Sequence, residues 1–168
     1  MRLLPFLAIA LLFNACRSGQ SIQDKRYPAH VGDISPDPKQ DDPAFTVCRE
    51  NYVPQYYSLE SGFEGEKPAI EAYFRKNFVH NRKHKAVDGY ITIRFVVNCQ
   101  GKTGRFRLQE VGPDLVAKQF PAELSSQLLR LVKSLQGWKP GMNNGVALDY
   151  YQYLTFKIKD GNIAEILP

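Results

Sequence analysis

The chain has 168 residues and a formal net charge of +5, and 43% of its residues are apolar. This length predicts one globular domain with an attached tether. The basic residues are scattered, and even the densest run, residues 81–85, is short. The charge therefore indicates a solvated face and argues against a nucleic-acid-binding protein.

The N-terminus has the features of an export signal. Residues 3–13 form an apolar run that is shorter than the roughly 20 residues needed to cross a bilayer but suits the apolar region of a signal peptide, about 7–15 residues. Cys16 follows Ala15, an arrangement that resembles a bacterial lipoprotein cleavage site. We expect residues 1–16 to be a signal peptide with lipid attached at Cys16; the alternative is an uncleaved short anchor. The expected location is the cell envelope, facing the periplasm and anchored by lipid in the outer rather than the inner membrane.

Two polar or irregular segments follow the signal. Residues 17–44 are rich in Pro, Asp, Lys and Ser, a composition that predicts a flexible tether. Residues 45–64 carry aromatic residues without a clear period and are interpreted as an irregular arm packed on the domain. Residues 65–168 are interpreted as the domain itself.

Cys48 and Cys99 remain once Cys16 carries lipid. An exported chain meets an oxidising compartment, in which thiol pairs form disulfides. Cys99 also continues the core-facing alternation of the strand before it. We expect a Cys48–Cys99 disulfide that joins the arm to the first strand; the alternative is two buried free thiols.

The domain is predicted to be α+β. Its helices and strands show helical and alternating apolar patterns respectively. The expected order is a short preceding helix at 67–79, strands at 90–99 and about 105–111, a main amphipathic helix at 121–136, a strand at about 147–158, and a short return strand at 163–167. The core of this prediction is a small three-stranded antiparallel sheet, ββαβ, covered by one main helix.

The order of these segments resembles the C-terminal domain of TonB-type energy transducers. The similarity lies in ordered pieces of residues 65–160: the opening strand, the Gly turn, the helix, a "W-x-P…N-G" segment and the closing strand, at 89–98, 101–103, 128–135, 138–145 and 153–158, with residues 72–78 as the short helix before them. The resemblance implies that Trp138 is a structural plug; the alternative is an exposed recognition aromatic. It also implies TonB-dependent outer-membrane receptors as partners.

Catalytic, metal and cofactor signals are weak. Residues 101–103 read Gly-Lys-Thr, but a phosphate-binding loop needs a Gly at the position of Val96 and a following helix. His80 and His84 are four residues apart, whereas a metal site needs three or four ligands. We therefore expect no enzyme activity, no cofactor and no metal.

The last predicted strand is the expected docking surface. Tyr151, Tyr153, Thr155 and Lys157 share one face of it, opposite Tyr150. An exposed aromatic strand at a sheet edge accepts an extended peptide by strand addition, so we expect these residues to bind an envelope protein. Two alternatives remain: an ordinary edge strand guarded by lysines, and a structural or envelope-maintenance lipoprotein that forms a homodimer through the same edge. A transducer also needs a spanning helix and a long rigid linker, so an adaptor or assembly factor is expected instead.

Overall fold

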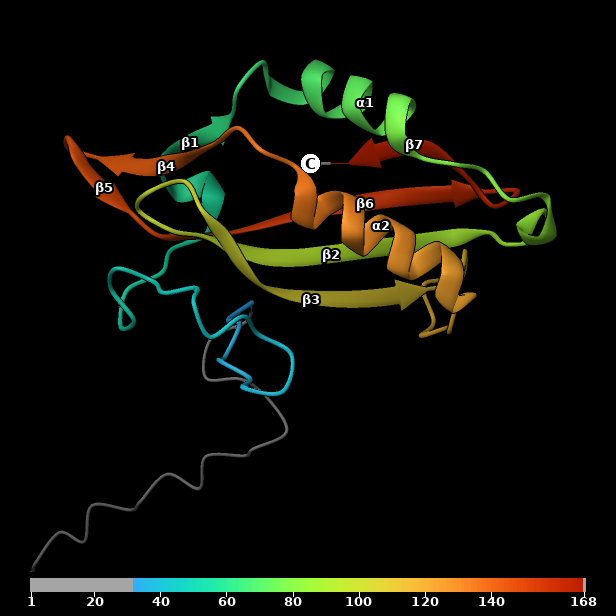
Figure 1. Cartoon of the computed structure of the whole chain (residues 1–168), viewed down its shortest axis with the longest axis horizontal. Coiled ribbons are helices and arrows are strands. Elements are labelled where there is room, and N and C mark those ends of the chain that lie inside the picture. The colour runs from blue at the N-terminus through green and yellow to red at the C-terminus, as the bar shows by residue number, and fades with distance from the viewer. Residues whose placement is uncertain (1–31, 168) are drawn as a thin grey trace, which may run out of the picture. The chain divides into compact units, whose positions relative to one another are not determined.

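The computed structural model describes residues 32–167, which form an α+β unit with two helices and two antiparallel sheets (Figure 1). The helices are α1 (Glu66–Asn77) and α2 (Ala122–Ser134), with 3-10 turns η1 (Tyr56–Ser58) and η2 (Arg82–His84). The strands are β1 (Glu60–Phe63), β2 (Gly89–Val97), β3 (Thr103–Val111), β4 (Trp138–Asn143), β5 (Val146–Leu148), β6 (Tyr150–Lys159) and β7 (Asn162–Leu167). The predicted lipid attachment site, Cys16, lies outside the described residues. No helix within 32–167 is long and apolar enough to cross a membrane.

The α+β class is confirmed, but the single three-stranded sheet is wrong. The larger sheet has four strands in the order β3-β2-β6-β7, and a second sheet has the order β1-β4-β5. The strand predicted at 147–158 is interrupted at Asp149, which separates β5 from β6. Tight turns with positive φ at both central residues, Asn144-Gly145 and Asp160-Gly161, form the hairpins that add β5 and β7.

The main core lies between the four-stranded sheet and the two helices. Alternate residues of β2 point into it, so that Ile91, Ile93 and Phe95 are fully buried. The helix α2 presents an apolar stripe that includes Leu124 and Leu128, both spaced for one helical face. Figure 1 shows α2 lying across the sheet, with α1 beside β7.

Residues 32–58, called the arm below, pack on part of the opposite face of the sheet. Ile34 is 3% exposed and forms a second small apolar cluster with Val96 and Tyr151. The tether predicted for residues 17–44 therefore cannot extend to residue 44, because the chain is already packed on the sheet at Ile34. The predicted arm at 45–64 likewise includes a regular strand, β1.

The strand predicted to be a free edge is an interior strand. β6 pairs with β2 on one side and with β7 on the other. β6 is an interior strand because the return strand predicted at 163–167 forms β7, which pairs with the second half of β6. In the described part of the chain, the outer strands of the larger sheet are β3 and β7.

Candidate docking site

The backbone of β6 shows which of its groups face β7. The N–H of Tyr151 donates to the carbonyl oxygen of Pro54 at 2.9 Å, so it points away from β2. In an antiparallel ladder alternate residues bond to the same side, and Tyr153, Thr155 and Lys157 therefore share this direction. Thr155 and Lys157 pair with β7, whereas Tyr153 lies between the arm and the end of β7.

The four predicted binding residues share one face of β6 but do not form an open surface. Tyr151 is 8% exposed beneath the arm, and burial raises the pKa of its hydroxyl. Tyr153 is half-buried against Tyr56, with ring centroids 5.6 Å apart. Thr155 is half-buried, and Lys157 alone among the four is exposed. The docking edge was predicted here because β6 was taken to be the last strand of the sheet, and that assumption was wrong.

A groove beside β7 takes the place of that edge. It has a volume of about 540 Å³ and lies between α1 and β7; we call it the β7 groove. Its walls carry both charges and apolar groups: Glu71, Phe74, Arg75, Phe78, His80 and residues 162–166. An open strand beside a helix is the arrangement in which an extended peptide adds to a sheet.

A bulge limits the regular part of the β7 edge. Ala164 is skipped by the ladder, because the residues on either side of it pair with Lys157 and Ile158. Bulges interrupt pairing and bend the strand. Ile166 lies beyond the bulge and pairs with Phe156 of β6. The backbone N–H and C=O of Phe156 bond to β2 and not to β7. By alternation, the N–H and C=O of Ile166 face away from β6 and into the groove.

The other outer strand, β3, is protected. Its ladder with β2 is also irregular, and Arg105 there has a positive φ of 53°. Arg105 and Arg107 are both engaged with the arm, through Glu50 and Asp41. Both outer strands carry a bulge, but charged residues also keep edge strands from pairing with other chains, and the two arginines of β3 make β7 the more available edge.

A smaller pocket, the Trp138 pocket, continues the β7 groove. It has a volume of about 240 Å³ and shares Ile166 with the groove. Trp138 is 7% exposed and contacts Phe63 and Phe95 edge-on, at centroid distances of 5.1 and 5.2 Å. Its Nε1–H has no hydrogen-bond partner among the described residues. An unpaired buried donor costs about 1–3 kcal/mol.

Tyr153 forms another part of the pocket wall. Its N–H donates to the side-chain Oε1 of the neighbouring Gln152 at 2.8 Å. This hydrogen bond is local, and no residue of the described chain pairs with Tyr153 on the β7 side. The ladder of β6 thus has one open position, directly beside the pocket.

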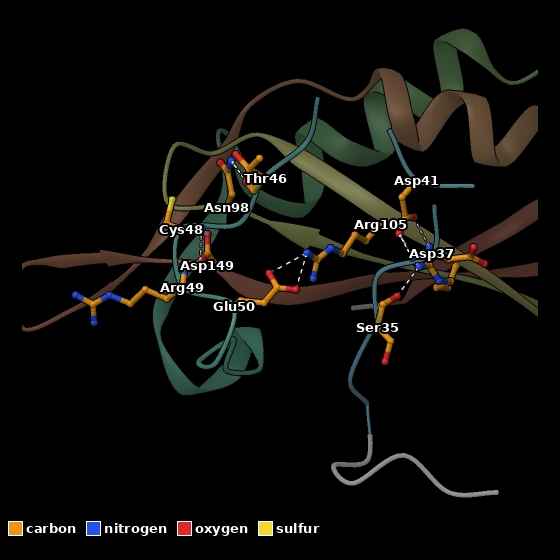
Figure 2. A network of polar contacts seen from close by, with 11 residues as sticks. Ser35, Asp37, Asp41, Thr46, Cys48, Arg49, Glu50, Asn98, Arg105 and Asp149 are labelled. Atoms are coloured by element: carbon orange, nitrogen blue, oxygen red, sulfur yellow. Dashed lines mark hydrogen bonds and ion pairs between the residues drawn. The ribbon is translucent and has the colours of Figure 1, made fainter. Parts of the chain in front are cut away.

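The arm is held to the sheet by a set of polar contacts around Asp149, which we call the latch (Figure 2). Asp149 is fully buried. Its carboxylate accepts from the N–H groups of Cys48, Arg49 and Cys99 at 2.8–3.0 Å. Several backbone donors compensate for the loss of water around a buried carboxylate. The latch therefore fixes one point of the arm to both β2 and β6.

The disulfide predicted between Cys48 and Cys99 is confirmed. It joins Cα atoms 6.1 Å apart across a sequence separation of 51 residues. These two sulfur atoms and the Asp149 carboxylate lie close enough to form a three-ligand metal site. Metal ligation by cysteine requires thiolates, however, and the oxidised pair offers none.

A second contact holds the start of the arm. Arg107 donates to both carboxylate oxygens of Asp41, at 2.6 and 2.9 Å, and to the carbonyl of Ser35 at 2.7 Å. These hydrogen bonds lower the pKa of Asp41 below its ordinary value. The charged pair fixes the arm near Ile34.

The residues that hold the arm were not recognised from their sequence pattern. Asp149, Asp41 and Arg107 carry the polar contacts described above, and none of them was predicted to hold the arm. A signal existed for Asp149, which is a charged residue between two strongly apolar strand segments. Comparisons with protein-family models, curated proteins and solved structures found no match to this chain.

Proposed function

We propose that this protein is a non-catalytic cell-envelope lipoprotein whose domain binds a protein partner by β-strand addition at β7. The observation that supports this most is the β7 groove, in which the outward backbone groups of Ile166 face α1. The added strand pairs with Ile166, gaining main-chain hydrogen bonds, while α1 contacts its side chains. The four-stranded sheet becomes a five-stranded one.

The resemblance to the TonB C-terminal domain supports a partner in the same compartment. We propose a TonB-like domain attached to the outer membrane through lipid on Cys16, and a partner linked to TonB-dependent transport. The confirmed disulfide is consistent with an oxidising compartment. In this role the domain acts as an adaptor or assembly factor.

Site-specific photo-cross-linking tests the docking edge. A cross-linking residue at Arg75, in the groove, should capture the partner in intact envelopes, and the same residue at Gln109, on exposed β3, should not. Capture from Gln109 alone would place docking on the opposite edge. Cross-links between two copies of the chain from Arg75 would instead support the self-associating, structural role.

Replacement of Cys16 by Ser tests the anchor. The variant should remain a longer precursor or leave the membrane fraction, because the lipid-bearing thiol is gone. Unchanged size and membrane retention would contradict lipidation without affecting the docking proposal.

A further inference from the structure

The arm occupies a part of the β6 edge that β7 leaves uncovered. β7 pairs with β6 from Thr155 to Lys159. Before that stretch, Gln55 of the arm forms an isolated parallel bridge with Tyr151, and the N–H of Tyr151 donates to the carbonyl oxygen of Pro54 at 2.9 Å. The arm therefore takes the place of a strand beside the first residues of β6.

The disulfide ties this arm covalently to the sheet, and it lies at the surface. Cys48 is exposed and Cys99 is half-buried, so a reductant approaches the bond from the Cys48 side. The remaining ties are noncovalent. They are the hydrogen bonds of the latch, the ion pairs of Arg105 and Arg107, and the small apolar cluster around Ile34.

Asp149 is placed so that departure of the arm leaves no buried charge without a partner. Its carboxylate and the two sulfur atoms lie within 4.8 Å of one another. With the arm in place, the buried carboxylate accepts from the N–H groups of Cys48 and Arg49 on the arm and of Cys99 in the turn after β2. When the arm leaves, the Cys99 donor stays and water replaces the other two. Hydration then offsets the lost hydrogen bonds.

Tyr56 marks the end of the segment that can leave the sheet. Its side chain packs against the main core on the helix face, and its ring meets Tyr153 edge-on. The residues before it pack against the smaller cluster instead, where Phe45, Val47 and Val53 are only partly buried. A segment with few buried apolar contacts opens at a lower free energy than a core element.

We propose that the arm is a redox-sensitive strap, which reduction of the Cys48–Cys99 disulfide releases from the sheet. Release of residues 32–55 uncovers Val96, Tyr151 and the outward backbone groups of β6, next to the open position at Tyr153. Reoxidation closes the arm again. This inference goes beyond the proposed function and does not depend on docking at β7.

The reductant is a dithiol, and the exchange balances. One thiolate of the dithiol attacks Cys48 Sγ, and the S–S bond breaks with its electron pair going to Cys99 Sγ, which takes up a proton. The second thiolate of the dithiol then displaces Cys48 Sγ, which is protonated in turn. The protein gains two electrons and two protons, and the dithiol becomes a disulfide.

Amide exchange of the wild type, with and without dithiothreitol in native buffer, tests the strap. Arg49 and Tyr151 report on it, because their N–H groups bond across the interface between arm and sheet. Both should exchange at least about tenfold faster after reduction. Gln152 is the control, since by alternation its N–H faces β2, and its exchange should stay slow.

Three results would overturn the proposal. The first is unchanged exchange at Tyr151 in protein whose two thiols have been shown by alkylation to be free. The second is equal acceleration at Gln152, because the whole domain would then be unfolding. The third is a disulfide that dithiothreitol reduces only after denaturant has unfolded the domain.

Two variants separate the disulfide from the other ties. The double variant Cys48→Ser, Cys99→Ser should exchange quickly at Tyr151 with or without dithiothreitol. Glu50→Gln removes the ion pair to Arg105 from the same arm, but the Glu50 side chain is 51% exposed and exposed pairs contribute little. This variant should stay protected when oxidised and respond to dithiothreitol as the wild type does. Oxidised Glu50→Gln that exchanges as quickly as the double variant would show that the ion pair, and not the disulfide, holds the arm.

Discussion

The two faces of the four-stranded sheet are stabilised in different ways. On the helix face, β2 and β6 pack against α1 and α2 in one continuous apolar core. On the arm face, the buried apolar cluster contains three residues, Ile34, Val96 and Tyr151, and polar contacts do much of the holding. Many weak contacts stabilise the first face, and a few specific ones stabilise the second.

This difference in packing determines how each face of the sheet responds to the loss of a single contact. Loss of one large side chain from the core leaves a cavity that the neighbours fill only in part. Loss of a latch contact frees the arm locally, because the helix-face core does not depend on it. The arm should therefore open at a lower free energy than the rest of the domain.

The largest expected effect is on the helix face. Trp138→Ala should lower the free energy of unfolding by about 3–5 kcal/mol, because it removes a buried ring between Phe63 and Phe95. Chemical denaturation measures this loss. Trp138→Phe keeps most of the packing and should cost much less. An unchanged denaturation midpoint for Trp138→Ala would show that the residue is not the structural plug.

Removal of the disulfide should have the next largest effect, confined to the arm face. The double variant Cys48→Ser, Cys99→Ser should lose about 2–4 kcal/mol of unfolding free energy, because the unfolded chain regains freedom in a long loop. Amide exchange should accelerate at residues 45–50 and remain slow at Ile93. Equal acceleration at both places would mean that the two faces unfold as one unit.

The buried carboxylate of the latch should matter less than the disulfide. Asp149→Ala removes the acceptor of three backbone N–H groups and should cost about 1–3 kcal/mol. Asp149→Asn keeps one acceptor oxygen and should cost less. Denaturation of both variants with the disulfide intact measures the difference, and identical losses would mean that the hydrogen bonds are not the source of the effect.

The smallest expected effect depends on pH. Hydrogen bonds from Arg107 lower the pKa of Asp41 in the folded protein below 3.8. The contribution of this contact to folding stability is therefore present above pH 3.8 and is lost as the pH falls through the lower folded pKa. Asp41→Asn should therefore cost about 0.2–1 kcal/mol at neutral pH and progressively less as the pH falls below 3.8. A difference that grows on acidification would contradict this assignment.

The helix face could be largely predicted from the sequence, and the arm face could not. Alternation in β2 and the stripe of α2 identified Ile91, Phe95 and Leu128 as core residues because one face of each element is apolar throughout. The latch has no such period. Asp149 is placed by donors from two distant segments, and only the fold brings these together.

The docking edge was mispredicted for a related reason. The sequence marks a turn at residues 160–162 and an apolar segment after it, but strand pairing decides whether that segment covers β6 or remains separate. Once β7 pairs with Thr155 and Lys157, the backbone groups that face away from the sheet are those of Ile166. The Trp138 pocket also depends on tertiary contacts among β1, α1 and β6.

Amide exchange at Ile166, with and without the captured partner, tests the central claim most directly. Strand addition at β7 predicts that this amide exchanges quickly in the free protein and becomes protected in the complex, while Gln109 on β3 is unchanged. Protection of Gln109 with no change at Ile166 would contradict docking at β7.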